Sequence, residues 1–295
     1  MLITETPSAQ HTELDLYSTD KLIAVLIEDQ FDAVHAVRAA APQIAAAVMQ
    51  ALPRIQRGGR LIYVGAGTSG RLGVLDSVEL FPTFSWPNER AVGVLAGGHQ
   101  AMFTAIEGAE DDALQGGADL LALQITDNDV VLLLAASGAT PYVMGALQAA
   151  RAGGALTIGF ANNVNAPITA KADIGVTLNT GNELISGSTR LKAGTSQKIA
   201  LNTFSSALMI RLNKVYGNLM VDLKPTNAKL LRRAISLTMF ATGCDEASAS
   251  QTLAQCDQHV KTAVVALLNR SSVAAAQARL AQSDGNVRQA LDQGA

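Results

Sequence analysis

The sequence feature that most constrains the fold is an alternation of short apolar runs and helical segments across the middle of the chain. The apolar runs are rich in Val, Leu and Ile, which is typical of strands buried on both faces of a parallel sheet. Helices must then cover both sides, so we predict an α/β fold with a doubly wound parallel sheet. The predicted strands are Leu61–Gly65, Ala91–Leu95, Val130–Ala135, Ala155–Phe160 and Ile174–Leu178, and the helices between them lie near Ser69–Leu80, Asp111–Leu123 and Pro141–Arg151.

Helical patterns flank this region on both sides. Residues 19–57 carry apolar side chains at three- and four-residue spacing, which predicts two helices, and the polar first 18 residues are expected to form an extended arm. A long helix is predicted over Leu191–Tyr216. After Pro225, short Ala- and Leu-rich helices predict a small all-helical domain: Ala228–Thr242, Glu246–Cys256, His259–Leu268 and Ser272–Gln282. The expected division is residues 1–55 (arm and helices packing on the α/β domain), 56–224 (the α/β domain) and 225–295 (the helical domain).

Composition argues against several classes of function. The 295 residues carry a formal net charge of −3 without a dense run of Lys or Arg, so nucleic acid is not expected as a partner. No apolar run approaches the roughly 18 residues of a membrane-spanning helix. Cys244 and Cys256 lack a C-x-x-C spacing and are expected to be free thiols. Without a signal-peptide pattern, we expect a cytoplasmic protein with no membrane partner.

A glycine-rich loop follows the first predicted strand. The stretch VGAGTSG contains Gly65, Gly67 and Gly70 in a G-x-G-x-x-G pattern, which also occurs in dinucleotide-binding folds. A dinucleotide site needs an acidic residue at the end of the second strand, whereas AVGVLAGGHQ ends in glycines and a histidine. Thr68 and Ser69, at the expected start of the helix, suit a phosphate monoester.

Two further hydroxyl clusters occupy comparable positions. Ser137 and Thr140 follow a predicted strand and precede a helix with Pro141 at its first position, and residues 186–189 (SGST) precede the long helix. Ser and Thr at such positions are often simple helix caps. Because parallel strands end at one edge of the sheet, two loops of the same design instead favour an anion site at helix N-termini. Their hydroxyls favour a sugar phosphate.

Carboxylates are the remaining candidates for acid–base chemistry. The four histidines are scattered singly, so no metal site is expected. Glu79 lies in the apolar stretch LDSVELFPTF, and burial there would raise the pKa of its carboxyl group towards a range useful for proton transfer. In AIEGAEDD, Asp111 and Asp112 fit helix capping, which leaves the role of Glu110 open. Glu183 adjoins the third hydroxyl cluster and is a further candidate.

Helix geometry separates Glu79 from the glycine-rich loop. In a regular helix Glu79 lies roughly 15 Å from Ser69, which exceeds the length of a hexose phosphate. Either the helix bends near Pro82, or Glu79 serves a phosphate loop of another subunit. We therefore expect a homodimer whose sites are shared across the interface.

Together, these motifs mark a family resemblance. GAGTSGRLGVLDSVELFPTF, AIEGAEDD, ASGATPYV and KVYGNLMVDLKPTNAKL resemble the N-acetylmuramic acid 6-phosphate etherases, bacterial enzymes of peptidoglycan recycling that are built on the sugar isomerase (SIS) fold. The resemblance runs from about Thr4 to the C-terminus, and the helical tail resembles the family's ubiquitin-associated-like domain. Leu80 and Phe81 depart from the Cys-Pro that often follows the first glutamate of the family.

The resemblance implies cleavage of the D-lactyl ether of N-acetylmuramic acid 6-phosphate by elimination of lactate and addition of water. Two catalytic glutamates of the family correspond to Glu79, as the acid and base of the lactate and water steps, and to Glu110, as the base at C2. The phosphate-binding positions correspond to Thr68, Ser69, Ser137 and Thr140. No cofactor or metal is implied, because elimination beside a carbonyl needs only acid–base groups and positioned donors.

Two alternatives share the phosphate loops. An aldose–ketose isomerase would also remove a C2 proton without losing lactate, and a sugar-phosphate sensor like the glucokinase regulatory protein would bind without turnover. The presence of both Glu79 and Glu110 favours the etherase. The sequence assigns no role to Glu183, Lys192 or His99.

Overall fold

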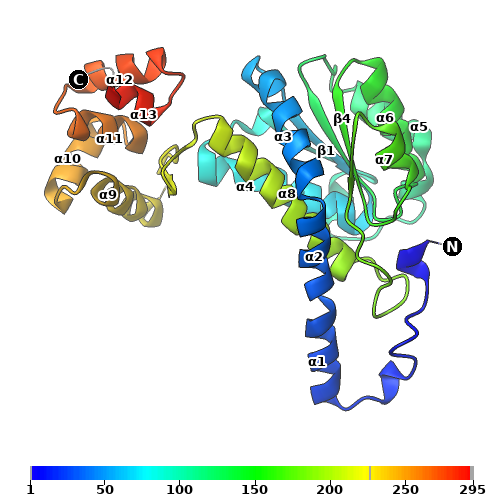
Figure 1. Cartoon of the computed structure of the whole chain (residues 1–295). Coiled ribbons are helices and arrows are strands. Elements are labelled where there is room, and N and C mark those ends of the chain that lie inside the picture. Colours follow the sequence, from blue (N-terminus) through cyan, green and yellow to red (C-terminus); the bar gives the residue numbers. More distant parts are fainter. Residues whose placement is uncertain (1, 226, 293–295) are drawn as a thin grey trace. The chain divides into compact units, whose positions relative to one another are not determined.

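The structure is a computed structural model that describes residues 2–225 and 227–292. Contacts divide the chain into two compact units: an α/β unit (Met1–Val78 and Asn88–Ser206) and a helical unit (Glu79–Pro87 and Ala207–Ala295). Figure 1 shows both units. The expected boundaries at 55/56 and 224/225 stay a prediction.

Within the described residues, five parallel strands form the sheet of the α/β unit in the order β2-β1-β3-β4-β5. Leu61 of β1 lies opposite Ala91 of β2 on one side and Val130 of β3 on the other. The predicted α/β fold class is confirmed. The strands are β1 (Leu61–Gly65), β2 (Ala91–Leu95), β3 (Val130–Leu134), β4 (Leu156–Ala161) and β5 (Ile174–Thr177).

Helices cover both faces of the sheet. As a result, β1 and β3 are buried along their whole length. On one face, Ile62 and Val131 belong to a core shared with α5 and α6. On the other face, Gly73 of α4 closely approaches Tyr63 and Leu134. Figure 1 shows α5, α6 and α7 on one side of the sheet and α3, α4 and α8 on the other. The helices that begin in this unit are α1 (Thr19–Asp29), α2 (Phe31–Ala39), α3 (Ala41–Gln56), α4 (Gly67–Phe84), α5 (Ala113–Leu121), α6 (Pro141–Ala152), α7 (Pro167–Lys171) and α8 (Lys192–Arg211), with 3-10 turns η1 (Ile3–Glu5), η2 (Leu14–Leu16), η3 (Asn88–Arg90), η4 (His99–Met102) and η5 (Ala109–Asp111).

Residues 19–57 form three helices rather than the predicted two. Breaks occur at Gln30 and Ala40. The second break precedes Pro42, whose nitrogen has no hydrogen to donate to the carbonyl group one turn earlier. The long helix also ends earlier than predicted, at Arg211, because Val215–Tyr216 and Leu219–Met220 pair as the hairpin β6–β7 around Gly217.

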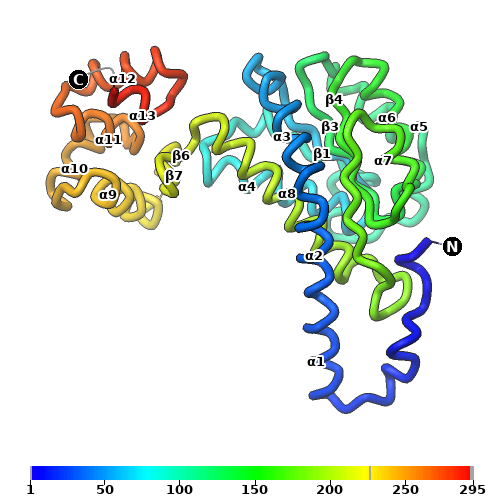
Figure 2. The backbone as a smooth tube through the Cα atoms, viewed as in Figure 1, coloured from blue at the N-terminus to red at the C-terminus, as the bar shows by residue number. Residues whose placement is uncertain are grey.

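The N-terminal arm is not simply extended. It forms the turns η1 and η2, and it returns beside the loop that precedes α8 (Figure 2). Gly187 donates its backbone N–H to the Thr4 carbonyl group at 3.2 Å, and the Ser186 hydroxyl donates to the Glu5 carbonyl group at 2.7 Å. The arm is thereby fastened to residues that lie far along the chain.

The helical unit has a core of its own, in which Leu253, Val260 and Val264 are fully buried. Asp222 forms ion pairs with Lys214 and Lys261 and so ties the hairpin to α11. A last helix, α13, is additional to the four predicted. The helices are α9 (Ala228–Thr242), α10 (Glu246–Gln255), α11 (Val260–Leu268), α12 (Val273–Gln282) and α13 (Val287–Asp292). Across both units, the described helices include none with the length and hydropathy that crossing a membrane requires.

The buried sheet predicts the effect of a cavity-forming substitution. Leu132 of β3 is 0% exposed, so Leu132→Ala should lower the free energy of unfolding of the α/β unit by about 2–5 kcal/mol. Leu121 is 60% exposed at the end of α5, and Leu121→Ala should change it by no more than about 0.5 kcal/mol. Urea titrations followed by circular dichroism measure both, and equal effects of the two substitutions would contradict this description of the core.

Candidate functional site

The strand order reverses direction between β1 and β3. After β1 the chain crosses to β2 at one edge, and from β3 it proceeds through β4 to β5 at the other. Such a switch point opens a crevice at the carboxyl ends of the strands, where α/β proteins bind ligands. The structure has a cavity of about 530 Å³ at this place, lined by Leu2, Thr4, Glu5, Ala66, Gly67, Thr68, Ser69, Glu110, Asp111, Ala135, Ala136, Ser137, Ala139, Thr140, Pro141, Gly187 and Thr189. We call it the phosphate cavity, after the ligand that the sequence predicts.

The glycines of VGAGTSG occupy their positions for different structural reasons. A Cβ atom on Gly65 would lie 2.7 Å from the Cα atom of Gly70, and one on Gly70 would lie 2.6 Å from the Gly65 backbone, so neither position has room for a side chain. Gly67 has a φ of +52° and faces open space. This turn starts α4 at the cavity, with Thr68 and Ser69 in its first turn. The positive end of the α4 dipole therefore lies at the cavity.

The second loop presents its hydroxyls to the cavity rather than to the helix. Thr140 is the N-cap residue of α6, yet its side chain makes no capping hydrogen bond. The Ser137 Oγ and Thr140 Oγ1 atoms lie 3.4 Å apart, and Ser137 Oγ also accepts the backbone N–H of Ala139. Gly138, with a φ of +71°, packs closely against Ala166 and holds the turn. The geometry therefore differs from that of a simple helix cap.

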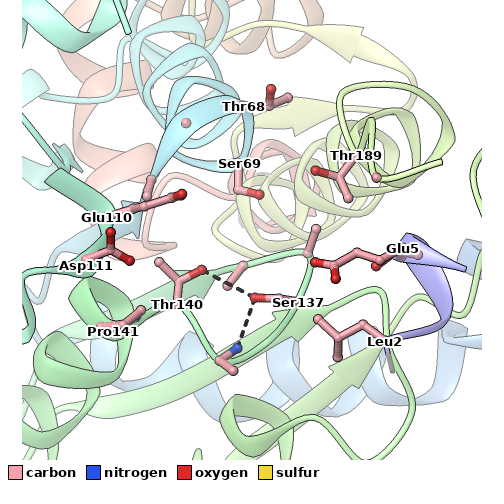
Figure 3. A pocket seen from close by; sticks show the side chains of 17 residues that line it. Leu2, Glu5, Thr68, Ser69, Glu110, Asp111, Ser137, Thr140, Pro141 and Thr189 are labelled. Carbon is pink, nitrogen blue, oxygen red and sulfur yellow. Dashed lines mark hydrogen bonds between the residues drawn. The ribbon is translucent and has the colours of Figure 1, made fainter. Parts of the chain in front are cut away.

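The N-terminal arm forms part of the cavity wall, which the sequence did not predict. The side chain of Asn163, after β4, accepts the backbone N–H of Ile3 at 2.8 Å and donates to the Thr4 hydroxyl at 3.1 Å. These contacts join residues about 160 positions apart, so no local pattern could have revealed them. Glu5, at the end of η1, points into the cavity (Figure 3).

Glu110 and Asp111 lie on the side of the cavity opposite Glu5, with Ser137 and Thr140 between them (Figure 3). Both carboxylates come from the turn η5. Asp112 alone caps α5, since its side chain accepts the backbone N–H of Gln115 at 2.9 Å. The capping expected for Asp112 therefore occurs, whereas Asp111 lines the cavity beside Glu110.

Glu79 is not among the residues that line the phosphate cavity. It lies on α4, which continues through Pro82 to Phe84, so the chain does not leave the helix and turn back at Pro82. Glu79 lies ten positions after Ser69 in this helix, which corresponds to roughly 15 Å along its axis. Its side chain is exposed, contrary to the burial expected from the apolar sequence around it.

Glu183 and Lys192 hold the start of α8. Glu183 is fully buried and accepts the backbone N–H groups of Lys192 and Ala193 at 3.2 and 2.9 Å. Burial raises the pKa of Glu183, although both N–H groups oppose that change. Lys192 Nζ donates to Asp29 and Asp32 at 2.7 and 2.9 Å and anchors α1 and α2. These contacts give both residues a structural role.

The described residues contribute no cationic side chain to the lining of the phosphate cavity; its polar groups are hydroxyls, carboxylates and the N-termini of α4 and α6. Over residues 2–225 and 227–292, no three His, Cys, Asp or Glu side chains are grouped so that they could hold a metal ion, and His99 is exposed on η4. The arrangement can hold a phosphate through hydroxyls and helix dipoles and can move protons through Glu110.

Comparisons with known proteins identify the domain to which this part of the chain is similar. The models for the glucokinase regulatory protein N-terminal SIS domain and for the SIS domain match residues 43–151 and 113–207. A phosphoheptose isomerase from Francisella tularensis has a similar structure, with a TM-score of 0.50 at 18% identity, over 65% of this chain and 98% of that one. This likeness supports the fold alone.

Curated relatives are similar over nearly the whole chain. An N-acetylmuramic acid 6-phosphate etherase from Deinococcus radiodurans is 56% identical over 99% of this chain and 95% of its own length. An etherase of the same name from Aliivibrio fischeri is 45% identical over 98% of this chain and 97% of its own. On this similarity and its SIS domain, the chain belongs to the N-acetylmuramic acid 6-phosphate etherase family.

Proposed function

We infer that this protein cleaves the D-lactyl ether of N-acetylmuramic acid 6-phosphate and yields N-acetylglucosamine 6-phosphate and D-lactate. The observation that carries the inference is the phosphate cavity at the switch point, with Glu110 on its wall, in a chain of the etherase family. The reaction recycles an amino sugar of peptidoglycan.

We assign the 6-phosphate to Thr68, Ser69, Ser137 and Thr140. These residues follow β1 and β3, the two strands on either side of the switch point. The hydroxyls donate hydrogen bonds, and the N-termini of α4 and α6 place partial positive charge beside the phosphate oxygens. This assignment accounts for the Thr140 side chain, which does not cap α6, and for its hydrogen bond with Ser137 at 3.4 Å.

Elimination begins once the sugar ring opens to the C1 aldehyde, which acidifies the proton on C2. Glu110 takes that proton as general base, the electron pair forms a double bond between C2 and C3, and the bond from C3 to the lactyl oxygen breaks. Glu79 donates a proton to the departing lactate oxygen. The products of this half-reaction are D-lactate and an unsaturated aldehyde.

Addition of water completes the reaction. Glu79, now a carboxylate, removes a proton from the water that attacks C3, and Glu110 returns a proton to C2. The ring then closes to N-acetylglucosamine 6-phosphate. The reaction consumes one ether and one water molecule and forms one hydroxyl group at C3 and one molecule of D-lactate. Both glutamates regain their starting protonation states.

The position of Glu79 favours a site completed by a second subunit. Leu75 lies one turn before Glu79 and Val78 directly precedes it, and both side chains are exposed, so the surface of α4 near this carboxylate is partly apolar. A partner subunit that covers this face would bring its own phosphate cavity to Glu79. We therefore propose a homodimer with shared active sites.

The first two long helices supply a second argument for the dimer. Helix α1 has no buried residue, although Ile23 and Ile27 are apolar and are followed on the same side by Phe31 and Val34 of α2. Each of the four side chains is more than half exposed, at 51–59%. A contiguous apolar stripe of this kind is typical of an interface between copies of a chain.

We place the enzyme in the cytoplasm. Both cysteines are free thiols, and free thiols persist in a reducing compartment.

The mechanism predicts that both glutamates are required. Glu110→Gln and Glu79→Gln should each lower kcat about 100- to 10,000-fold, because an amide neither takes nor gives the proton. A coupled assay for D-lactate, with purified protein and N-acetylmuramic acid 6-phosphate, measures the rates.

Glu89→Gln is the matched control for both variants. Glu89 is an exposed carboxylate that precedes β2, at the end of the sheet opposite the cavity, and its removal should leave kcat unchanged. An active Glu110→Gln variant would remove Glu110 from the mechanism.

The phosphate assignment predicts weaker binding after loss of one hydroxyl. Ser137→Ala should raise KM about tenfold or more, since it removes a hydrogen bond to a charged group. Thr203→Ala, on the exposed side of α8, should leave KM unchanged. If Ser137→Ala leaves KM at the wild-type value, Ser137 does not bind the phosphate.

The dimer predicts complementation. An inactive Glu79→Gln variant and an inactive Ser137→Ala/Thr140→Val variant, mixed and allowed to exchange subunits, should regain part of the activity, because mixed dimers contain one intact site. Ile27→Asp should give monomers in sedimentation, whereas Leu121→Asp should not. Mixed dimers without any returned activity would show that each subunit uses its own Glu79.

A further inference from the structure

A second cavity adjoins the phosphate cavity at Glu110. Its volume is about 260 Å³, and it shares Ala66, Gly67 and Glu110 with the phosphate cavity. The rest of its lining comes from Arg71 on α4, from Ala96 and Ala101, and from the loop Ala105–Ala109. A molecule that occupies both cavities must therefore pass the carboxylate proposed as the base at C2.

Arg71 is the one cationic side chain that the described residues contribute to the lining of either cavity. Its Nε atom donates to the Ala101 carbonyl group at 2.9 Å. Within residues 2–225 and 227–292, its two terminal amino groups donate to no protein acceptor and form no ion pair. A guanidinium group carries five N–H donors in a planar fork, so most of the binding capacity of Arg71 remains for a ligand.

Helix stability does not account for Arg71. It lies one turn from the N-terminus of α4, where a positive charge adds to the positive end of the helix dipole instead of offsetting it. Arg71 is partly buried, and Arg71 does not line the phosphate cavity. Its charge therefore suits a second anion, separate from the phosphate.

The substrate of the proposed function has such an anion, the carboxylate of its lactyl group. With the phosphate at Ser137 and Thr140 and with C2 beside Glu110, the neighbouring atom C3 also lies close to Glu110. A substituent on C3 then extends towards the second cavity. We propose that this cavity holds the lactyl group and that Arg71 binds its carboxylate through a bidentate pair of hydrogen bonds. The proposal rests on the proposed function and names the contact that selects its substrate.

Two nearby carboxylates give the proposed contact between Arg71 and the lactyl carboxylate an electrostatic reason. The carboxylates of Glu107 and Glu110 belong to the lining of the same cavity, and both would repel a third carboxylate. Arg71 offsets that repulsion and fixes the leaving group beside C3. N-acetylglucosamine 6-phosphate lacks the lactyl group, so its binding does not depend on Arg71.

The test compares two ligands in one variant. Arg71→Gln should raise KM for N-acetylmuramic acid 6-phosphate about 10- to 100-fold through loss of charge-assisted hydrogen bonds. The inhibition constant of N-acetylglucosamine 6-phosphate, measured as a competitive inhibitor of D-lactate release, should stay within about twofold of wild type, since its contacts are unchanged. Lys171→Gln removes an exposed positive charge at the end of α7 and should change neither constant.

A purely structural role predicts a different result. If Arg71→Gln weakens both ligands equally, or leaves both constants unchanged, the lactyl subsite is wrong. Arg71→Lys keeps the charge without the planar fork, so it should raise KM less than Arg71→Gln does, again without changing the inhibition constant. If Arg71→Gln folds poorly, Arg71→Lys is the variant that tests the proposal. A wild type that releases no D-lactate contradicts the proposed function itself, which separates the two failures.

Discussion

The whole site depends on one topological constraint, the reversal of strand order between β1 and β3. Both strands are buried on each face, so their side chains can only stabilise the sheet, and chemistry is confined to the loops that leave their carboxyl ends. Those loops diverge to opposite sides of the sheet and leave a crevice between them. The N-termini of α4 and α6 meet at this crevice with their hydroxyls and their dipoles, an arrangement that suits an anion.

The two cavities divide the anionic groups of the proposed substrate between different kinds of partner. Hydroxyls and backbone dipoles suit the phosphate, whereas the guanidinium of Arg71 suits a planar carboxylate. Glu110 lies where the cavities meet, which is the position that a base at C2 requires if C3 carries the group that leaves. In the proposed mechanism, phosphate binding, proton removal and departure of lactate therefore follow one another across the end of the sheet.

Local chemistry in the sequence predicted the sheet and the two hydroxyl loops, because strand burial, glycine turns and helix starts depend on near neighbours. It did not predict the arm at the cavity, because Thr4 and Asn163 are 159 residues apart and the arm has no periodicity. The burial expected for Glu79 was wrong, because apolar neighbours in sequence need not be buried, and Leu75 and Val78 are themselves exposed. The sequence did not predict a binding role for Arg71, because the second cavity beside it exists only when the loop after η4 is folded.

The most direct test of the mechanism is isotope incorporation during turnover in deuterium oxide. If Glu110 removes the C2 proton before lactate departs, N-acetylglucosamine 6-phosphate formed by the wild type carries deuterium at C2, and the Glu110→Gln variant places none there. Proton NMR of the product measures this as loss of the C2 signal. In solvent that is also labelled with oxygen-18, a wild type that forms the same product with its original hydrogen at C2 and without the label at C3 would break the ether without elimination and would contradict the role of Glu110 as the base at C2.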